Sequence, residues 1–271
     1  MGARRAVALC CCFGGFLQYQ LGDWQRAEAE LRQAVTLYRD IGSASGEALS
    51  LQRLGVLLTA RGQLEPAMTA FDEGLFAAER AVLRSHCLTR LYASMARNRL
   101  AAGDITAAAQ HLQAGNTTAL RHGHCITCDA LLLPEAVRVA LALGDVATAD
   151  LQAQQLEATA RRFGSHAWQA MACQARGRVL TASHQPELAY QAFREAYHAF
   201  SAINIIYEAA RCLLGQAQAL QAGADAARAA EATALQAQAT TVFTSLGAAG
   251  IEAQAARLSV PPSLSIAVSL G

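Results

Sequence analysis

Apolar and polar residues alternate along this chain in long amphipathic stretches, which short turns separate. Six of these turns are alike, and their central residues are Gly22, Gly62, Gly103, Gly144, His184 and Gly223. A regular period of about 40 residues is typical of a solenoid, because each helix pair must stack on its neighbours to bury its apolar face. The pattern therefore predicts an all-α solenoid of about six antiparallel helix pairs.

Small residues recur at fixed distances from these turns, on both helices of each pair. The fifth residue after the turn is alanine in five copies, and small residues also stand seven before it and twelve after it: Ala27, Ala67, Ala108, Ala149, Ala189; Gly15, Gly55, Ala96, Gly177; Ala34, Gly74, Gly115, Ala196. Small side chains at matching positions allow two antiparallel helices to cross closely. We expect a larger residue at such a position to push the helix axes apart.

These positions resemble the tetratricopeptide repeat (TPR) from about residue 4 to residue 258. One copy runs Gly55, Gly62, Ala67, Phe71 and Gly74. The period exceeds the usual roughly 34 residues and is similar to the longer-helix variant in the sensor regions of MalT-like and LuxR-type bacterial regulators. The resemblance implies a right-handed superhelix with a concave binding face, and it leaves the ligand open because one scaffold serves many functions.

The first segment imitates a signal peptide, since Arg4 and Arg5 precede an apolar run over residues 6–17. Gly15, however, lies in repeat register with Gly55, so we expect a first repeat helix instead. This helix begins almost directly after Met1, which suggests a fragment of a longer protein or a late start site.

The end of the chain is expected to form a cap. An Ala-rich helix should run to about Leu246, where Gly247 ends it, and a shorter helix should follow over residues 248–258. Pro261 and Pro262 forbid its continuation. We thus expect one repeat domain over residues 1–258 and a flexible tail over residues 259–271.

Composition narrows the function further. The net charge is +1 and no long basic run occurs, so direct nucleic-acid binding is not expected. No apolar stretch reaches the roughly 18 residues that span a bilayer, and the eight cysteines suit free thiols in a reducing cytoplasm. The chain has no nucleophile elbow, His-Glu-x-x-His motif or phosphate loop, so we expect no enzyme.

Arginine occupies one equivalent position in three consecutive repeats, six residues before the turn: Arg97, Arg138 and Arg178. First helices of neighbouring pairs lie about 8–10 Å apart, so the guanidiniums should form a row on the concave face. Arginine matches carboxylates and phosphates in geometry. These three residues, with Arg90, Gln52 and Gln174 nearby, are the candidate ligand-binding residues.

Two alternatives remain open for this row of arginines. They could form an inter-repeat lattice of ion pairs with Glu135, Asp129 or Glu208, or they could simply be solvated. Under the ligand interpretation, the partner is a protein or peptide segment or a small anionic effector.

A second cluster combines thiols and imidazoles over residues 122–128. Cys125 and Cys128 share a helix face, and Cys128 is equivalent in register to Cys87. With His124, or with His86 or His122 in its place, they could bind zinc, copper(I) or another thiophilic metal, or form a redox switch. The alternative is that these cysteines are inert packing residues, in which case the protein has no cofactor.

The sequence thus favours a non-enzymatic interaction or sensor module of a bacterial signalling or transcription regulator. A thiol-based metal or redox sensor on the same scaffold is the alternative.

Overall fold

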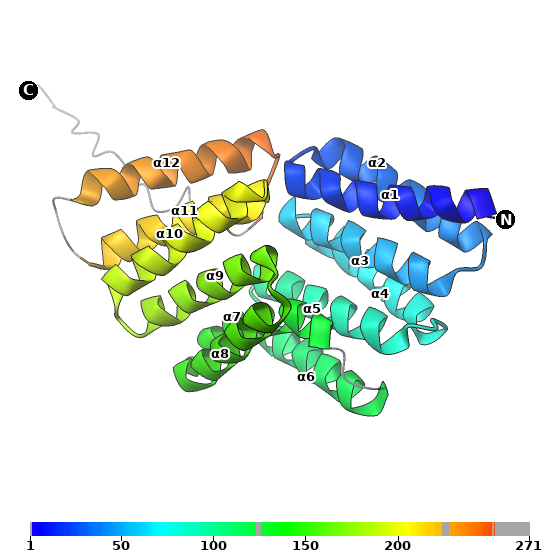
Figure 1. Cartoon of the computed structure of the whole chain (residues 1–271), viewed down its shortest axis with the longest axis horizontal. Coiled ribbons are helices and arrows are strands. Elements are labelled where there is room, and N and C mark those ends of the chain that lie inside the picture. The colour runs from blue at the N-terminus through cyan, green and yellow to red at the C-terminus, as the bar shows by residue number, and fades with distance from the viewer. Residues whose placement is uncertain (1, 123–125, 224–227, 251, 253–271) are drawn as a thin grey trace, which may run out of the picture.

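The computed structural model describes residues 2–122, 126–223, 228–250 and 252. These ranges contain twelve α-helices and no strand (Figure 1). The helices are α1 (Gly2–Leu21), α2 (Trp24–Asp40), α3 (Ala44–Ala60), α4 (Leu64–Glu79), α5 (Arg84–Ala101), α6 (Ile105–His122), α7 (Ile126–Ala142), α8 (Val146–Phe163), α9 (His166–Ala182), α10 (Pro186–Ala202), α11 (Ile206–Ala222) and α12 (Ala229–Ser245).

The expected solenoid is confirmed, with the helices packed in antiparallel pairs that stack in chain order. The odd-numbered helices α1, α3, α5, α7, α9 and α11 contact one another in sequence and form the inner layer of the curved array (Figure 1). The even-numbered helices flank them on the outside. None of the helices in the described ranges is both long and apolar enough to cross a bilayer.

The turns between paired helices follow from their residues. Gly62 adopts a left-handed φ of 79°, and its N–H donates to the carbonyl of Thr59 at 3.0 Å. His184 takes the same conformation in the fifth turn, with φ 57°. Asp23 and Asp145 cap the following helices, because each carboxylate accepts a hydrogen bond from a backbone N–H three residues later.

The small residues lie where helices cross. A Cβ on Gly55 would overlap the ring of Phe71 in the paired helix. Gly177 and Gly215 stand on two sides of the ring of Phe193, where an added Cβ would come within 3.0 and 2.7 Å of it. These three glycines therefore make room for the aromatic side chain of a neighbouring helix.

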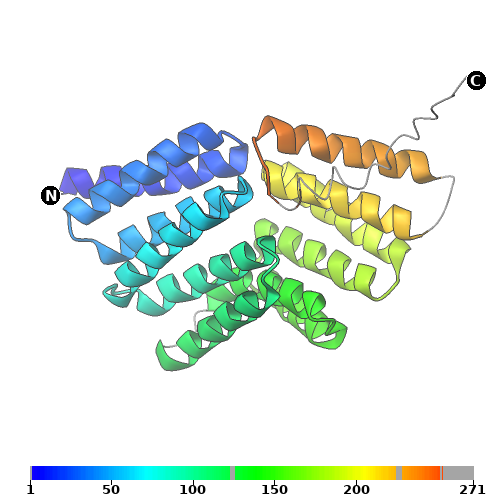
Figure 2. The ribbon, with the colours of Figure 1, turned by 180° about the vertical axis from the view of Figure 1, so that it is seen from behind.

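The two ends of the solenoid meet, which the repeat pattern did not predict. Trp24 at the start of α2 lies edge-on to Tyr207 of α11 at 5.4 Å, and Tyr207 lies edge-on to Phe243 of α12 at 5.7 Å. One apolar cluster joins residues of the first and last repeats. Figures 1 and 2 both show the end of α12 beside the turn between α1 and α2. The array is therefore closed across its concave side.

The cap begins as expected, since α12 ends at Ser245 and Gly247 has a left-handed φ of 66°. The short helix expected over residues 248–258 lies mostly outside the described residues, although Glu252 is described and helical. The tail expected over residues 259–271 lies outside them entirely.

Candidate functional site

The inner helices enclose a cavity of about 290 Å³ near the centre of the molecule. Its walls come from α1, α3, α5, α7, α9 and α11, so every helix pair of the described solenoid contributes to it. All six candidate ligand-binding residues line it: Gln52, Arg90, Arg97, Arg138, Gln174 and Arg178. The structure thus brings together residues that the sequence placed on one face, around a partly enclosed central cavity.

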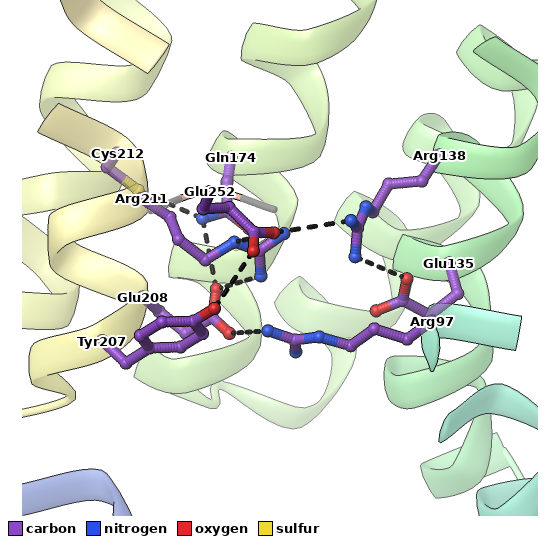
Figure 3. A network of polar contacts seen from close by, with 9 residues as sticks. All are labelled: Arg97, Glu135, Arg138, Gln174, Tyr207, Glu208, Arg211, Cys212 and Glu252. Carbon is purple, nitrogen blue, oxygen red and sulfur yellow. Dashed lines mark hydrogen bonds and ion pairs between the residues drawn. The ribbon is translucent and has the colours of Figure 1, made fainter. Parts of the chain in front are cut away.

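Glu208 of α11 is the centre of one half of a polar network (Figure 3). Its carboxylate lies 3.0 Å from Arg97 of α5 and 2.6 Å from Arg211 of its own helix. The side-chain amide of Gln174 donates to the same carboxylate at 3.4 Å. This half of the network therefore joins α5, α9 and α11.

Glu252 is the centre of the other half. Its carboxylate lies 3.0 Å from Nε of Arg211 and 3.5 Å from a guanidinium nitrogen of Arg138, and it accepts a hydrogen bond from the hydroxyl of Tyr207 at 3.0 Å. Arg138 also pairs with Glu135 at 3.0 Å. The segment after α12 therefore delivers a carboxylate into the centre of the solenoid (Figure 3).

The arginines keep the carboxylates ionised despite their burial. Burial alone would raise the pKa of Glu208, but Arg211 and Arg97 outweigh it and lower this pKa to about 2. Burial likewise opposes ionisation of Glu252, yet Arg211 and Arg138 hold its pKa well below the ordinary range. Burial raises the pKa of the Tyr207 hydroxyl, which stays a hydrogen-bond donor.

Arg178 differs from Arg97, Arg138 and Arg211. It makes no hydrogen bond or ion pair with any residue that the structure describes, whereas Arg97, Arg138 and Arg211 each contact a glutamate. Burial, and then the like charges of Arg211 and Arg138, lowers its pKa to about 9. Arg178 is therefore still cationic at neutral pH, in a place where a further positive charge is unfavourable.

The three arginines of the row thus differ in their role: some form ion pairs within the protein, and one is left available for a ligand. Arg97 pairs with Glu208 of α11, as the inter-repeat lattice alternative proposed. Arg138 instead pairs with Glu135 of its own helix and with Glu252, and Arg178 faces the cavity without such a partner among the described residues. Gln52 donates to the hydroxyl of Ser94 at 2.7 Å.

The sequence analysis missed Arg211, Tyr207 and Glu252. Arg211 carried a signal, because it is the one basic residue of α11 and is buried among the apolar residues of that helix. The sequence gives no such signal for Glu252, because this residue lies after the last regular repeat and so has no equivalent position on the concave face.

The proposed thiol cluster can be followed only in part, because His124 and Cys125 lie outside the described residues. Sγ of Cys128 lies 3.1 Å from Nδ1 of His86, while Sγ of Cys87 faces the carbonyl of Ser45 at 3.9 Å. Burial raises the pKa of Cys87 to about 11, which disfavours a thiolate ligand. Among the residues that the structure describes, no group of three or more His, Cys, Asp or Glu could hold a metal ion.

Comparison with known proteins places this fold in a family. The sequence pattern of the MalT-like TPR region matches residues 4–252. The chain belongs to the MalT-like TPR family.

The MalT-like TPR fold is also seen among solved structures. The crystal structure of BtubC (BKLC) from P. vanneervenii is similar, with a TM-score of 0.53 and 15% sequence identity over 85% of this chain and 92% of that chain. This likeness concerns the fold alone. A comparison with curated proteins finds no match.

Proposed function

We propose that this MalT-like TPR domain is the non-enzymatic sensor module of a bacterial regulator, and that its central cavity binds a small anionic effector. The observation that carries the proposal is Arg178, a half-buried guanidinium that lines the cavity without a carboxylate partner among the described residues. An unpaired buried charge is costly. A ligand carboxylate or phosphate beside Arg178 would remove that cost and form a charge-assisted hydrogen bond.

Closure of the solenoid favours a small effector over a protein segment. The cavity of about 290 Å³ is near the lower end of the usual range for small-molecule sites. Its arginines come from α5, α7, α9 and α11, so an anion held by several of them would add a further link between repeats that the ion pair of Arg97 and Glu208 already joins across the centre. Binding would then favour one pitch of the solenoid over another and transmit a signal to an attached domain.

Thermal unfolding of the purified protein with a panel of anions tests this function. Acetate, short dicarboxylates and inorganic phosphate serve as probes. We expect at least one of them to raise the unfolding temperature of the wild type, because a ligand of the folded state stabilises it. Arg178→Gln should abolish this increase and should itself stabilise the free protein, since it removes a poorly compensated charge.

Arg194→Gln is the matched control, because Arg194 is exposed on α10 and does not line the cavity. It should keep the response to the anion. An Arg178→Gln variant that responds as the wild type does, or a wild type that no anion stabilises, would contradict the proposed site.

A further inference from the structure

Apolar side chains gather at one end of the central cavity. Leu131 of α7 and Trp168 and Met171 of α9 line it from the first halves of their helices, and Ile205, which immediately precedes α11, lines it as well. Met171 and Ile205 pack on the same apolar cluster. All four side chains are only half-buried, so part of their apolar surface stays exposed. Because removing such surface from water is favourable, this end of the cavity suits the apolar part of a ligand.

The row of arginines forms the other end. Arg97, Arg138 and Arg178 stand in the last two turns of α5, α7 and α9. These three helices run in the same direction, since an outer helix that runs back follows each of them (Figure 1). In α5 the position equivalent to Leu131 and Met171 is occupied by Arg90, so the apolar end is formed by α7, α9 and the start of α11. The cavity is therefore amphipathic along the inner helices.

The balance of charges at the cationic end favours a ligand with one negative charge. Three guanidiniums of the network are matched by three carboxylates: Arg97, Arg138 and Arg211 by Glu135, Glu208 and Glu252. Arg178 adds one positive charge beside this set. A second carboxylate on the ligand would lie near the glutamates, and like charges repel each other.

The dimensions of the cavity limit the apolar body. Its volume of about 290 Å³ corresponds to roughly ten non-hydrogen atoms, since one water molecule takes about 30 Å³ of the liquid. Met171 stands seven residues before Arg178 on α9, which is roughly 10 Å along the helix axis. The long side chain of Arg178 leans back toward the start of the helix and shortens this distance. One small molecule can therefore contact both residues.

We propose that the effector is an amphipathic monocarboxylate with a compact aryl or alkyl body. Its carboxylate pairs with Arg178, and its body lies against Leu131, Trp168 and Met171. The inference rests on the proposed function, because it describes the occupant of the same cavity. Trp168 offers an aromatic surface to an aryl group, and the flexible thioether of Met171 adapts to its shape. Inorganic phosphate and short dicarboxylates fill only the cationic end.

Isothermal titration calorimetry with four matched probes tests this inference. Phenylacetate carries both parts, acetate lacks the ring, phenylacetamide lacks the charge, and succinate has a second carboxylate in place of the ring. We expect phenylacetate to bind at least about tenfold more tightly than each of the others, because it alone buries an apolar body and pairs with Arg178.

The same titrations separate this inference from the proposed function. If acetate or succinate binds as tightly as phenylacetate, and Arg178→Gln abolishes that binding, the inference is wrong and the proposed function stands. If phenylacetamide binds as tightly as phenylacetate, the inference is wrong because the charge is not recognised. A protein that binds no anion would refute both.

Two variants test the two ends separately. Met171→Gln should weaken the binding of phenylacetate by at least about fivefold and leave that of acetate unchanged, since it alters only the apolar end. Arg178→Gln should reduce the affinity for phenylacetate to that for phenylacetamide. Met68→Gln is the matched control, because Met68 is also half-buried but belongs to α4 and does not line the cavity. If Met171→Gln loses no more affinity than this control, the apolar end does not bind the ligand.

Discussion

Single residues of the centre contribute to the stability of the fold and line the proposed binding site. Glu208 and Glu252 are largely buried carboxylates held ionised by three arginines, and Arg178 lies among these charges without an ion-pair partner in the described chain. Removing one partner from a buried pair costs roughly 3–5 kcal/mol, because the other charge is left uncompensated. The paired residues are therefore constrained by stability, and Arg178 is the one whose replacement the fold tolerates best.

The lowered pKa of Glu208 predicts how stability depends on pH. A carboxyl whose pKa is lower in the folded state than in the unfolded state stabilises the fold above its ordinary pKa of about 4.3. This contribution is lost as pH falls through the folded value of about 2. We expect the free energy of unfolding, measured with urea, to fall steeply between these two pH values.

Glu208→Gln should lower stability at neutral pH by about 3–5 kcal/mol and should flatten this acid slope, since the titrating group is gone. Glu187→Gln, at an exposed position of α10, is the control and should keep the wild-type slope. An unchanged slope in Glu208→Gln would show that other groups cause the acid transition.

At the scale of the helix, close crossing depends on the recurring small residues. The positions seven before and twelve after each turn could be found from the sequence, because the same packing problem returns in every repeat. The structure adds their partners: the ring of Phe71 against Gly55, and Leu91 against Gly74, where an added Cβ would lie 2.7 Å from a methyl of Leu91. These partners come from the facing helices, which the spacing alone does not identify.

Gly55→Ala should destabilise the protein by about 1–3 kcal/mol, because the new Cβ overlaps the ring of Phe71 and forces the two helices apart. Gly14→Ala is the control, since it is also helical but meets only the flexible end of Glu30. It should be neutral or stabilising by up to about 1 kcal/mol through helix propensity. Chemical denaturation measures both.

The double variant Gly55→Ala/Phe71→Leu provides a further check. A smaller side chain at position 71 makes room for the added methyl, so the double variant should lose less stability than the two single changes together. Simple additivity would mean that the two residues do not clash.

At the scale of the whole molecule, closure turns the concave face of the solenoid into a cavity. The contact of Trp24 with Tyr207 joins residues from opposite ends of the chain, and Tyr207 in turn donates to Glu252 in the central network. The same side chains therefore close the array and position a carboxylate at its centre. Together with the ion pair of Arg97 and Glu208 across the centre, this contact links repeats that are not neighbours and restrains the pitch of the whole solenoid.

Trp24→Ala should open the array without unfolding its repeats. We expect a larger radius of gyration by small-angle X-ray scattering, with the helical content by circular dichroism preserved. Trp168→Ala is the matched control, because Trp168 packs on Phe163 of the adjacent helix and takes no part in the contact between the ends. It should lower stability while leaving the radius of gyration unchanged. An unchanged radius in Trp24→Ala would show that this aromatic contact does not hold the ends together.

The sequence by itself determined the helices, their pairing and the inward position of the arginine row. These properties are local and repeated, so each copy reports the same helix propensity, turn geometry and packing of small residues. The tertiary structure decided that the ends meet and that Arg178 lacks, among the described residues, the carboxylate partner that Arg97 and Arg138 have. Closure depends on the small rotation between successive repeats, which adds up along the chain. The ion pairs of the central arginines depend on where this accumulated rotation places α11 and Glu252. Neither quantity is present in any single repeat.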